Sequence, residues 1–215
     1  MRNIGKRKKH ILEDILLNHI KNNLKQYIIA IILFVIGIIC GIIVISKMTQ
    51  TQYDEISYYL NNFITSLNDN AKIDKILLLK NTITRNFWIV LAIWFMGSTV
   101  IGIPIIYIML SYRGFCLGYA ISAIIAVFGV GKGLLFIFPS LFIHNILFIP
   151  ALFALVVSGH KVYKNIVKDK RRDNIKQELV RHTMFSLILL VCIEISALIE
   201  TYISVGLLQI CAKYI

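Results

Sequence analysis

The residues best suited to chemistry are two carboxylates and a histidine that lie inside strongly apolar stretches. Glu194 and Glu200 are six residues apart, about 120° around a helix, and Thr201 lies in or near the arc between them. His144, followed by Asn145, occupies an earlier apolar stretch. These groups predict either a path for protons or cations, or a hydrogen-bonded seam between helices. In both cases we expect the polar face to turn toward the protein interior, because an ionisable side chain is costly in lipid.

No enzyme signature accompanies these residues. The sequence lacks the H-E-x-x-H pattern of metalloproteases, the G-x-S-x-G pattern of serine hydrolases and an acidic pair placed like that of a glycosidase. The cysteines form no C-x-x-C pair and no second histidine lies at metal-site spacing from His144, so we expect neither a metal nor a cofactor. Gly129–Gly133 lacks the first glycine and the final Ser or Thr of a phosphate loop, and we interpret it as a turn between two spans.

The elements that position these residues are expected to lie in a lipid bilayer. Of the 215 residues, 58% are hydrophobic and 16% charged, and the mean hydropathy is +0.76; soluble proteins have roughly 45–50% apolar and about 25% charged residues. Apolar stretches that could span the membrane cover residues 27–45, 87–110, 115–130, 133–157 and 185–208. The predicted fold class is an all-α polytopic membrane bundle of about five transmembrane helices, with the fourth kinked or broken by Pro139 and Pro150.

The distribution of charge predicts the orientation. Residues 1–26 hold seven Lys and Arg and residues 158–184 hold eight, whereas residues 46–86 hold five against four acidic residues. Because Lys and Arg favour the cytoplasmic side, we expect the N-terminus and the 158–184 loop in the cytoplasm and the 46–86 loop and C-terminus outside. Arg113, in a predicted tight turn at Ser111–Gly114, is also expected on the cytoplasmic side. Since the basic residues follow the inner membrane face, nucleic-acid binding is not expected.

Two segments outside the spans have an amphipathic pattern. Residues 1–26 predict a basic helix on the anionic cytoplasmic leaflet, acting as an anchor or binding a partner. In the 46–86 loop, one apolar helical stripe consists of Tyr53, Ile56, Leu60, Phe63 and Leu67. This stripe either rests on headgroups or on the ends of the spans, or it receives a partner protein. A second helix in the loop is expected from the spacing of Ile73, Ile76, Leu77, Lys80 and Ile83.

Two local motifs carry a resemblance to a known family. Residues 112–118 read Y-R-G-F-C-L-G and residues 144–151 read H-N-I-L-F-I-P-A. With the basic amphipathic start, five spans and this length, the chain resembles the stage II sporulation protein M family. The motif positions expected to matter are Arg113, Gly114, Phe115, Gly118, His144, Asn145 and Pro150. We expect Gly114 to permit the tight turn, Gly118 to allow close helix approach, and Arg113 to hold headgroup phosphate or nearby carbonyls.

The resemblance implies a function in engulfment of the forespore, at the sporulation septum of the cell membrane. It implies a non-enzymatic scaffold that joins two peptidoglycan-degrading partners, a lytic transglycosylase and an amidase/endopeptidase. The alternative, from the residues themselves, is a small permease or the membrane subunit of a transporter that uses Glu194, Glu200 and His144. Small residues from Gly118 to Ala126 would allow close packing either in a homo-oligomer or within one chain.

Overall fold

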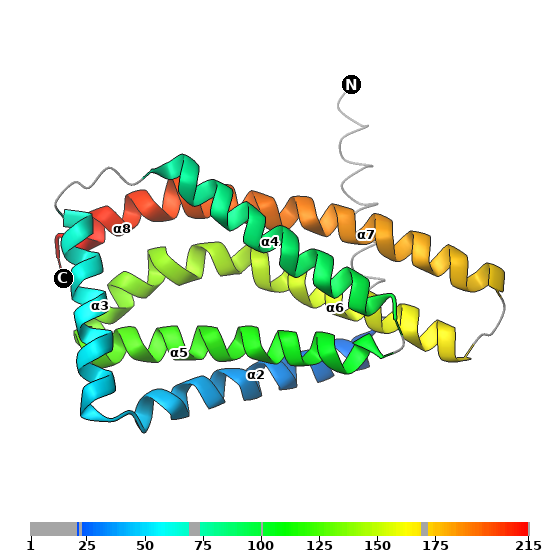
Figure 1. The fold of residues 1–215 in the computed structure, drawn as a ribbon, viewed down its shortest axis with the longest axis horizontal. Helices are drawn as coiled ribbons and strands as arrows, with labels where there is room; N and C mark the ends of the chain where they lie inside the picture. Colours follow the sequence, from blue (N-terminus) through cyan, green and yellow to red (C-terminus); the bar gives the residue numbers. More distant parts are fainter. Residues whose placement is uncertain (1–20, 22, 69–73, 100, 169–171, 215) are drawn as a thin grey trace.

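The chain folds into a bundle of long helices in a computed structural model that describes residues 21, 23–68, 74–99, 101–168 and 172–214. The predicted all-α membrane class is confirmed, and the described residues contain no strand (Figure 1). The predicted amphipathic helix over residues 1–26 lies almost entirely outside the described residues. In chain order the elements are α2 (Leu24–Ser46), α3 (Gln50–Asn68), α4 (Lys75–Gly97), α5 (Gly102–Ile137), η1 (Phe138–Phe142), α6 (Ile143–Lys168), α7 (Arg172–Ile199), η2 (Glu200–Ser204) and α8 (Val205–Ala212).

Four continuous helical stretches within the described residues are long and apolar enough to cross a membrane. They are Leu24–Ser46, Lys75–Gly97, Gly102–Val167 and Ile175–Ala212. The third holds 66 residues, and a straight helix of that length would measure about 100 Å, three times the hydrocarbon thickness of a bilayer. Instead it reverses direction, so that its two legs run side by side (Figure 1). The bundle therefore has roughly five passes, as the hydropathy predicts.

The reversal occurs at Gly129. Its φ of 75° and ψ of 171° lie in a region that residues with a Cβ essentially never adopt. The turn predicted at Gly129–Gly133 thus forms at the first of its glycines, and helix resumes immediately afterwards.

The turn before α5 lies elsewhere than predicted. The prediction of a tight turn at Ser111–Gly114 is wrong, because these residues lie inside α5. The chain turns instead between the end of α4 at Gly97 and the start of α5 at Gly102. There the Thr99 hydroxyl oxygen accepts a hydrogen bond from the Gly102 backbone N–H at 3.1 Å and so caps the start of α5. Residues 87–110 carry no charge, so hydropathy gave no sign of this break, and Arg113 was mistaken for a loop charge.

The start of α4 also differs from the prediction. Instead of a separate helix around Ile76–Ile83 in the outer loop, one helix runs from Lys75 to Gly97. Asp74 is its N-cap, and the carboxylate accepts hydrogen bonds from the backbone N–H groups of Ile76 and Leu77, both at 3.0 Å. The polar first half of α4, including Arg85, therefore enters the bundle.

The predicted irregularity of the fourth span is present at Pro139. This proline lies in the π-helical segment η1, while Pro150 lies inside α6. Proline lacks the backbone N–H that an α-helix uses, and a local π-turn accommodates its absence.

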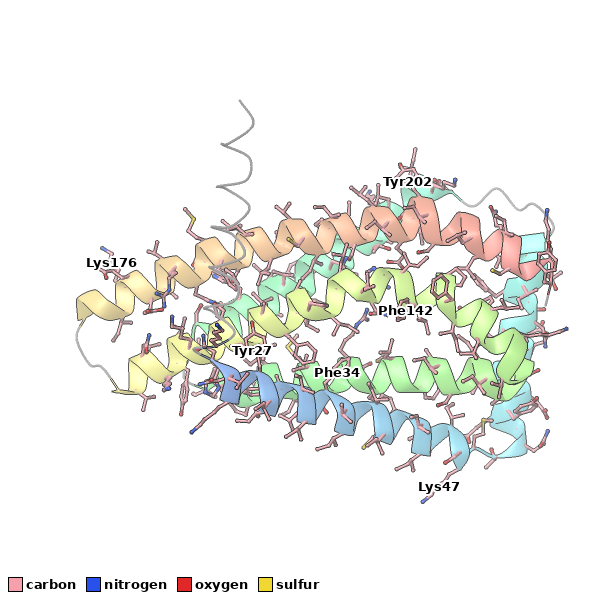
Figure 2. All side chains as sticks on the ribbon, turned by 180° about the vertical axis from the view of Figure 1, so that it is seen from behind. Tyr27, Phe34, Lys47, Phe142, Lys176 and Tyr202 are labelled. Atoms are coloured by element: carbon pink, nitrogen blue, oxygen red, sulfur yellow. The ribbon has the colours of Figure 1, made fainter. Side chains whose placement is uncertain are left out.

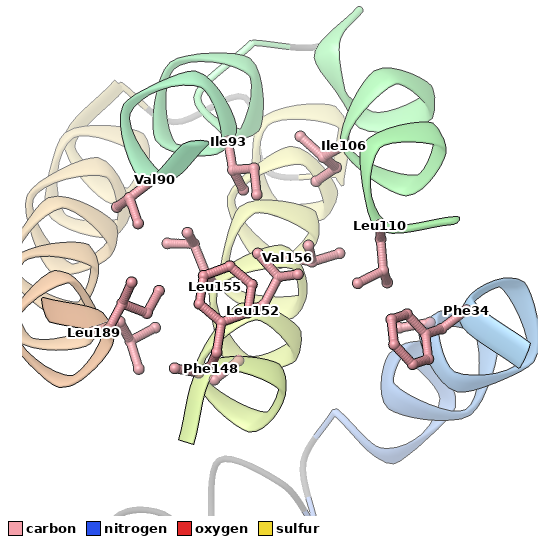
Figure 3. Close-up of a cluster of buried hydrophobic side chains, with 14 of the residues drawn as sticks. Phe34, Val90, Ile93, Ile106, Leu110, Phe148, Leu152, Leu155, Val156 and Leu189 are labelled. Carbon is pink, nitrogen blue, oxygen red and sulfur yellow. The ribbon is translucent and has the colours of Figure 1, made fainter. Parts of the chain in front are cut away.

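The main apolar core surrounds α6. Phe148, Leu152 and Leu155 of this helix are almost fully inaccessible, and Val90, Leu110 and Leu189 from three other helices pack around them (Figure 3). The outward faces, by contrast, are apolar and exposed, most clearly along α2. This distribution is the one expected of a bundle whose outer surface contacts lipid.

The two ends of the bundle differ. We call the end that carries α3, the Gly129 turn and α8 the α3 end; the end of α4, the start of α5, the end of α6 and the start of α7 lie at the other end (Figure 1). Lys47 and Lys176 lie toward these opposite ends (Figure 2). α3 lies across the ends of the passes (Figure 1).

Candidate functional site

Charged side chains from different passes meet inside the bundle. Nδ1 of His144, on α6, lies 3.2 Å from Oε2 of Glu200, the first residue of η2. The same nitrogen is 3.4 Å from the carbonyl oxygen of Ser196. Nη2 of Arg85, on α4, lies 3.9 Å from the same Glu200 oxygen. Glu200 therefore links α4 to α6.

Arg113 of α5 completes this group. Its Cζ lies 4.5 Å from the centroid of the Phe148 ring, an arrangement in which the ring face attracts the cation. His144 stacks on the same ring, with centroids 5.1 Å apart. Arg113 also interacts electrostatically with Arg85 and Glu200. We call Arg85, Arg113, His144 and Glu200 the polar centre. Its position excludes the expected contact of Arg113 with headgroup phosphate.

The polar centre lies at membrane depth. Arg85 is twelve residues from Gly97 and ten from Lys75, the two ends of α4. These separations correspond to about 18 and 15 Å of helix, against a hydrocarbon thickness of roughly 30 Å. The centre is thus placed where charges interact strongly and unpaired polar groups are costly.

Several buried polar atoms beside the polar centre have no hydrogen-bond partner among the described residues. They are both amide atoms of Asn86, Nε2 of His144, Oγ1 of Thr201 and Oγ of Ser204. Each such atom costs about 1–3 kcal/mol if nothing pairs with it. Thr201 and Ser204 belong to η2, and short π-helical segments of this kind frequently occur at functional sites.

The second predicted carboxylate does not join the polar centre. Both oxygens of Glu194 are buried without a hydrogen-bond partner within the described part of the chain, whereas Glu200 contacts His144 and Arg85. Glu194 and Glu200 are six residues apart, about 120° around the helix, and the residues between them lie in the regular α-helix α7. The two carboxylates therefore point to different surroundings, and the shared polar face predicted for Glu194, Glu200 and Thr201 does not form around His144.

The other polar motif residue on α6 has a local contact. Nδ2 of Asn145 donates a hydrogen bond to the carbonyl oxygen of Leu141, in η1, at 2.7 Å. Pro150 lies one and a half turns further along and is exposed on the surface of α6. Asn145 thus stabilises the irregular segment, while His144 reaches across to η2.

The motif glycines bring α5 into close contact with α2. A Cβ built on Gly114 would overlap the carbonyl oxygen of Phe34, and one built on Gly118 would overlap that of Ile38. The close approach expected for Gly118 is therefore present. Gly114 has the same function, and its predicted place in a tight turn is wrong. Phe115, between them, packs against Tyr119 with ring centroids 6.1 Å apart.

The partner surface on α2 has the same spacing. A Cβ on Gly37 or Gly41 would overlap the carbonyl oxygens of Ser111 and Phe115, respectively. In addition, the Ser111 hydroxyl donates a hydrogen bond to the carbonyl oxygen of Leu33 at 3.1 Å. Both helices thus carry a G-x-x-x-G pair on the contacting face, which is typical of tightly crossed transmembrane helices. Of the small residues of α5, Gly114 and Gly118 pack within the chain, whereas Ala126 is exposed.

The apolar stripe of α3 rests on the ends of the passes. Ile64 and Leu67 are buried against Ile124, Phe136 and Leu208. The other predicted stripe residues lie on this side as well: Leu60 packs against the same cluster, Phe63 meets the Phe136 ring at 6.2 Å, and Tyr53 and Ile56 are half-buried. Of the two expectations for this stripe, packing on the spans is correct, and the stripe is not free for a partner.

The rest of the α3 surface is open. Tyr58, opposite the packed stripe, is 72% exposed, and Asp54, Asn61 and Asn62 are exposed as well. Tyr59, on the flank of the helix, is 70% exposed and lines a groove together with Tyr119 of α5. These residues form what we call the tyrosine face of α3.

Four residues of the site region are not among the predicted site residues. Arg85 and Asn86 belong to the predicted outer loop, although the N-cap signal at Asp74 is visible in the sequence and extends the helix to include them. Gly37 and Gly41 lie in a predicted span, and their G-x-x-x-G spacing is the signal that identifies them.

The arrangement has the features of a structural and binding site. Within the described ranges, no three His, Cys, Asp or Glu side chains gather as a metal site would require. The polar centre instead pairs charges from separate passes and leaves polar atoms available for a further group.

Comparison with known proteins agrees with the motifs. No curated protein and no solved structure matches the chain. The family described as stage II sporulation protein M matches over residues 30–205, which include every pass, α3 and the polar centre. The chain therefore belongs to the stage II sporulation protein M family.

Proposed function

We propose that this protein is a non-enzymatic membrane scaffold that recruits peptidoglycan hydrolases to the septal membrane during engulfment. The proposal rests on one observation, the way in which α3 packs on the bundle. One face of this helix is anchored on the bundle through Ile64 and Leu67, and the tyrosine face points away. A helix held in this way presents a fixed surface to a partner without ordering on binding, which reduces the entropic cost of association.

The composition of the tyrosine face suits a protein partner. Tyr58 and Tyr59 offer large, rigid rings with a polar tip, and tyrosine is enriched at the energetic centres of interfaces. The proposal places the α3 end outside the cytoplasm, as the charge distribution predicts, which is the side where peptidoglycan lies. The lytic transglycosylase and the amidase/endopeptidase implied by the family resemblance would then bind there.

The buried position of the polar centre supports a non-enzymatic function. The carboxylate and histidine that could act as acid or base lie beside Arg85, which is roughly 15 Å from the nearer end of α4. A glycan strand or peptide stem would have to enter the hydrocarbon region to reach them, at a high desolvation cost. In this proposal the partner hydrolases cleave peptidoglycan, and this chain positions them at the membrane.

The test is capture of both hydrolases from sporulating cells by full-length protein. The variant Tyr58→Ser/Tyr59→Ser should insert and purify normally but retain little of either hydrolase. Tyr214→Ser is the matched control, because Tyr214 is an exposed tyrosine near the C-terminus at the same end of the bundle. Undiminished capture by the double variant, or equal loss in the control, would contradict recruitment through the tyrosine face.

A second candidate function, conduction of protons or cations, has one specific observation in its favour. His144 and Glu200 meet at 3.2 Å among buried polar atoms that lack partners. Against it, Arg85 and Arg113 lie beside Glu200 and repel an entering cation. Purified protein in vesicles with an internal pH dye tests the alternative. A proton flux that disappears in Glu194→Gln and Glu200→Gln would favour it over the scaffold.

A further inference from the structure

Arg85 presents a charge on the surface of the bundle at membrane depth. Its side chain is 53% exposed. It lies near the middle of α4, about 15 Å from the nearer end of the helix. Lipid chains cannot accept hydrogen bonds, and charged side chains at such depth face protein or a water-filled space almost without exception. The exposed part of Arg85 therefore requires a cover that the described residues do not supply.

The charges around Arg85 are unequal. Arg85 pairs with one carboxylate, that of Glu200, at 3.9 Å, and the Glu200 side chain is itself 24% exposed. No ion pair joins Arg113 to a carboxylate among the residues that the structure describes. With two guanidinium groups and one carboxylate, this group has a net charge of +1. In a medium of low dielectric constant, such an excess favours the approach of a negative charge.

The surface of α4 on either side of Arg85 is exposed. On α4, Asn81 and Trp88 stand four residues before and three residues after Arg85, on the same side of the helix, and both are exposed. Together with Arg85 they form a row parallel to the helix axis, with an aromatic ring and an amide on either side of the charge.

We propose that this row on α4 binds a transmembrane helix of another protein that carries a carboxylate at the depth of Arg85. A second copy of this chain fits less well, because a two-fold interface would place the same positive patch against itself. A phospholipid phosphate also fits less well, because it would have to leave the headgroup region to reach the middle of α4. The proposal goes beyond recruitment through α3: it does not require the partner to be a hydrolase, and a hydrolase could bind the tyrosine face without it.

The experiment uses the full-length protein in phospholipid vesicles and three synthetic helices. Each helix is a Leu-Ala transmembrane peptide with Glu, Gln or Leu at its centre and a dansyl group beside it. In a Trp94→Phe background, energy transfer from Trp88, which is one turn from Arg85, reports binding. The Glu peptide should bind at least about tenfold more tightly than the Leu peptide, because only a carboxylate can pair with Arg85.

Two variants test whether Arg85 is responsible for the preference for the Glu peptide. Arg85→Gln should remove the preference for the Glu peptide, whereas Lys80→Gln, an exposed charge change on the same helix, should leave it intact. Equal binding of the three peptides to unmodified protein would overturn the proposal whether or not Arg85→Gln folds. Arg85-dependent self-association of the protein without peptide would also overturn it, in favour of a second copy. Neither result bears on capture of hydrolases by Tyr58 and Tyr59, which is measured separately.

Discussion

Oε2 of Glu200 lies 3.2 Å from Nδ1 of His144, and this contact joins the π-turn at the end of α7 to the middle pass α6. His144 is buried, and Arg85 is the other charged neighbour of the same oxygen. The three residues come from segments that the sequence keeps far apart, so their meeting depends on how the passes pack.

Loss of either partner of this contact should destabilise the bundle. His144→Leu and Glu200→Gln should each lower the free energy of unfolding by about 1–3 kcal/mol, because each leaves a buried polar group with one partner fewer. Thermal unfolding in detergent measures the effect. The double variant should cost less than the sum of the single ones, since the two side chains act on each other. Strict additivity would mean that they do not interact. Asp54→Asn, on exposed α3, serves as the control and should be neutral.

The crossing of α2 and α5 should not tolerate a methyl group. Gly37→Ala and Gly114→Ala should each destabilise the protein by roughly 1–3 kcal/mol, because the new Cβ meets a backbone carbonyl that cannot move alone. Gly206→Ala is the matched control: nothing lies within 4 Å of a Cβ built there, and the change should be neutral or stabilising. Equal melting temperatures for Gly114→Ala and Gly206→Ala would show that the helices are not in close contact.

The reversal of chain direction within α5 should depend on the backbone conformation of Gly129 alone. Nothing lies within 4 Å of a Cβ at this position, so Gly129→Ala introduces no clash. It should nevertheless cost about 1–3 kcal/mol, since only glycine adopts φ 75° with ψ 171° readily. Gly131→Ala, two residues further on and equally uncrowded, should be tolerated. Unfolding of the two variants under identical conditions separates conformational strain from packing.

The two faces of α3 should respond differently to truncation. Leu67→Ala should cost about 2–5 kcal/mol because it removes a buried side chain from the cluster with Phe136 and Leu208. Tyr58→Ala should change stability by no more than about 0.5 kcal/mol, because the side chain is exposed. Proteolysis of α3 in detergent offers a second measurement, with faster cleavage expected only for Leu67→Ala. A strongly destabilised Tyr58→Ala variant would mean that the tyrosine face packs against the bundle.

The orientation predicted from charge can be measured with single cysteines. In a variant without its four native cysteines, Asp54→Cys and Lys176→Cys place one thiol at each end of the bundle. A membrane-impermeant maleimide added to intact cells should label the first and not the second. Labelling of both, or of the second alone, would refute the proposed orientation.

Hydropathy predicted the number of passes because the preference of a helix for lipid is a local sum over about twenty residues. It failed at Ser98–Thr99, where the chain turns between α4 and α5 with no change in apolar character. It failed again at Arg113, whose charge was taken as a sign of a loop although a ring of Phe148 and the other charges of the polar centre surround it inside α5.

The sequence by itself determined the membrane environment, the approximate count of helices, the turn at Gly129 and the amphipathic character of α3, and it singled out His144 and Glu200, because each follows from residue types at short spacing. Only the tertiary structure decided that Glu200 rather than Glu194 meets His144, that Arg85 joins them, and that α3 packs its apolar stripe on the bundle and exposes Tyr58 and Tyr59. These outcomes depend on the rotation of each helix about its axis. That rotation is set by packing between residues distant in the chain, such as that of Gly37 against Ser111 where α2 and α5 cross.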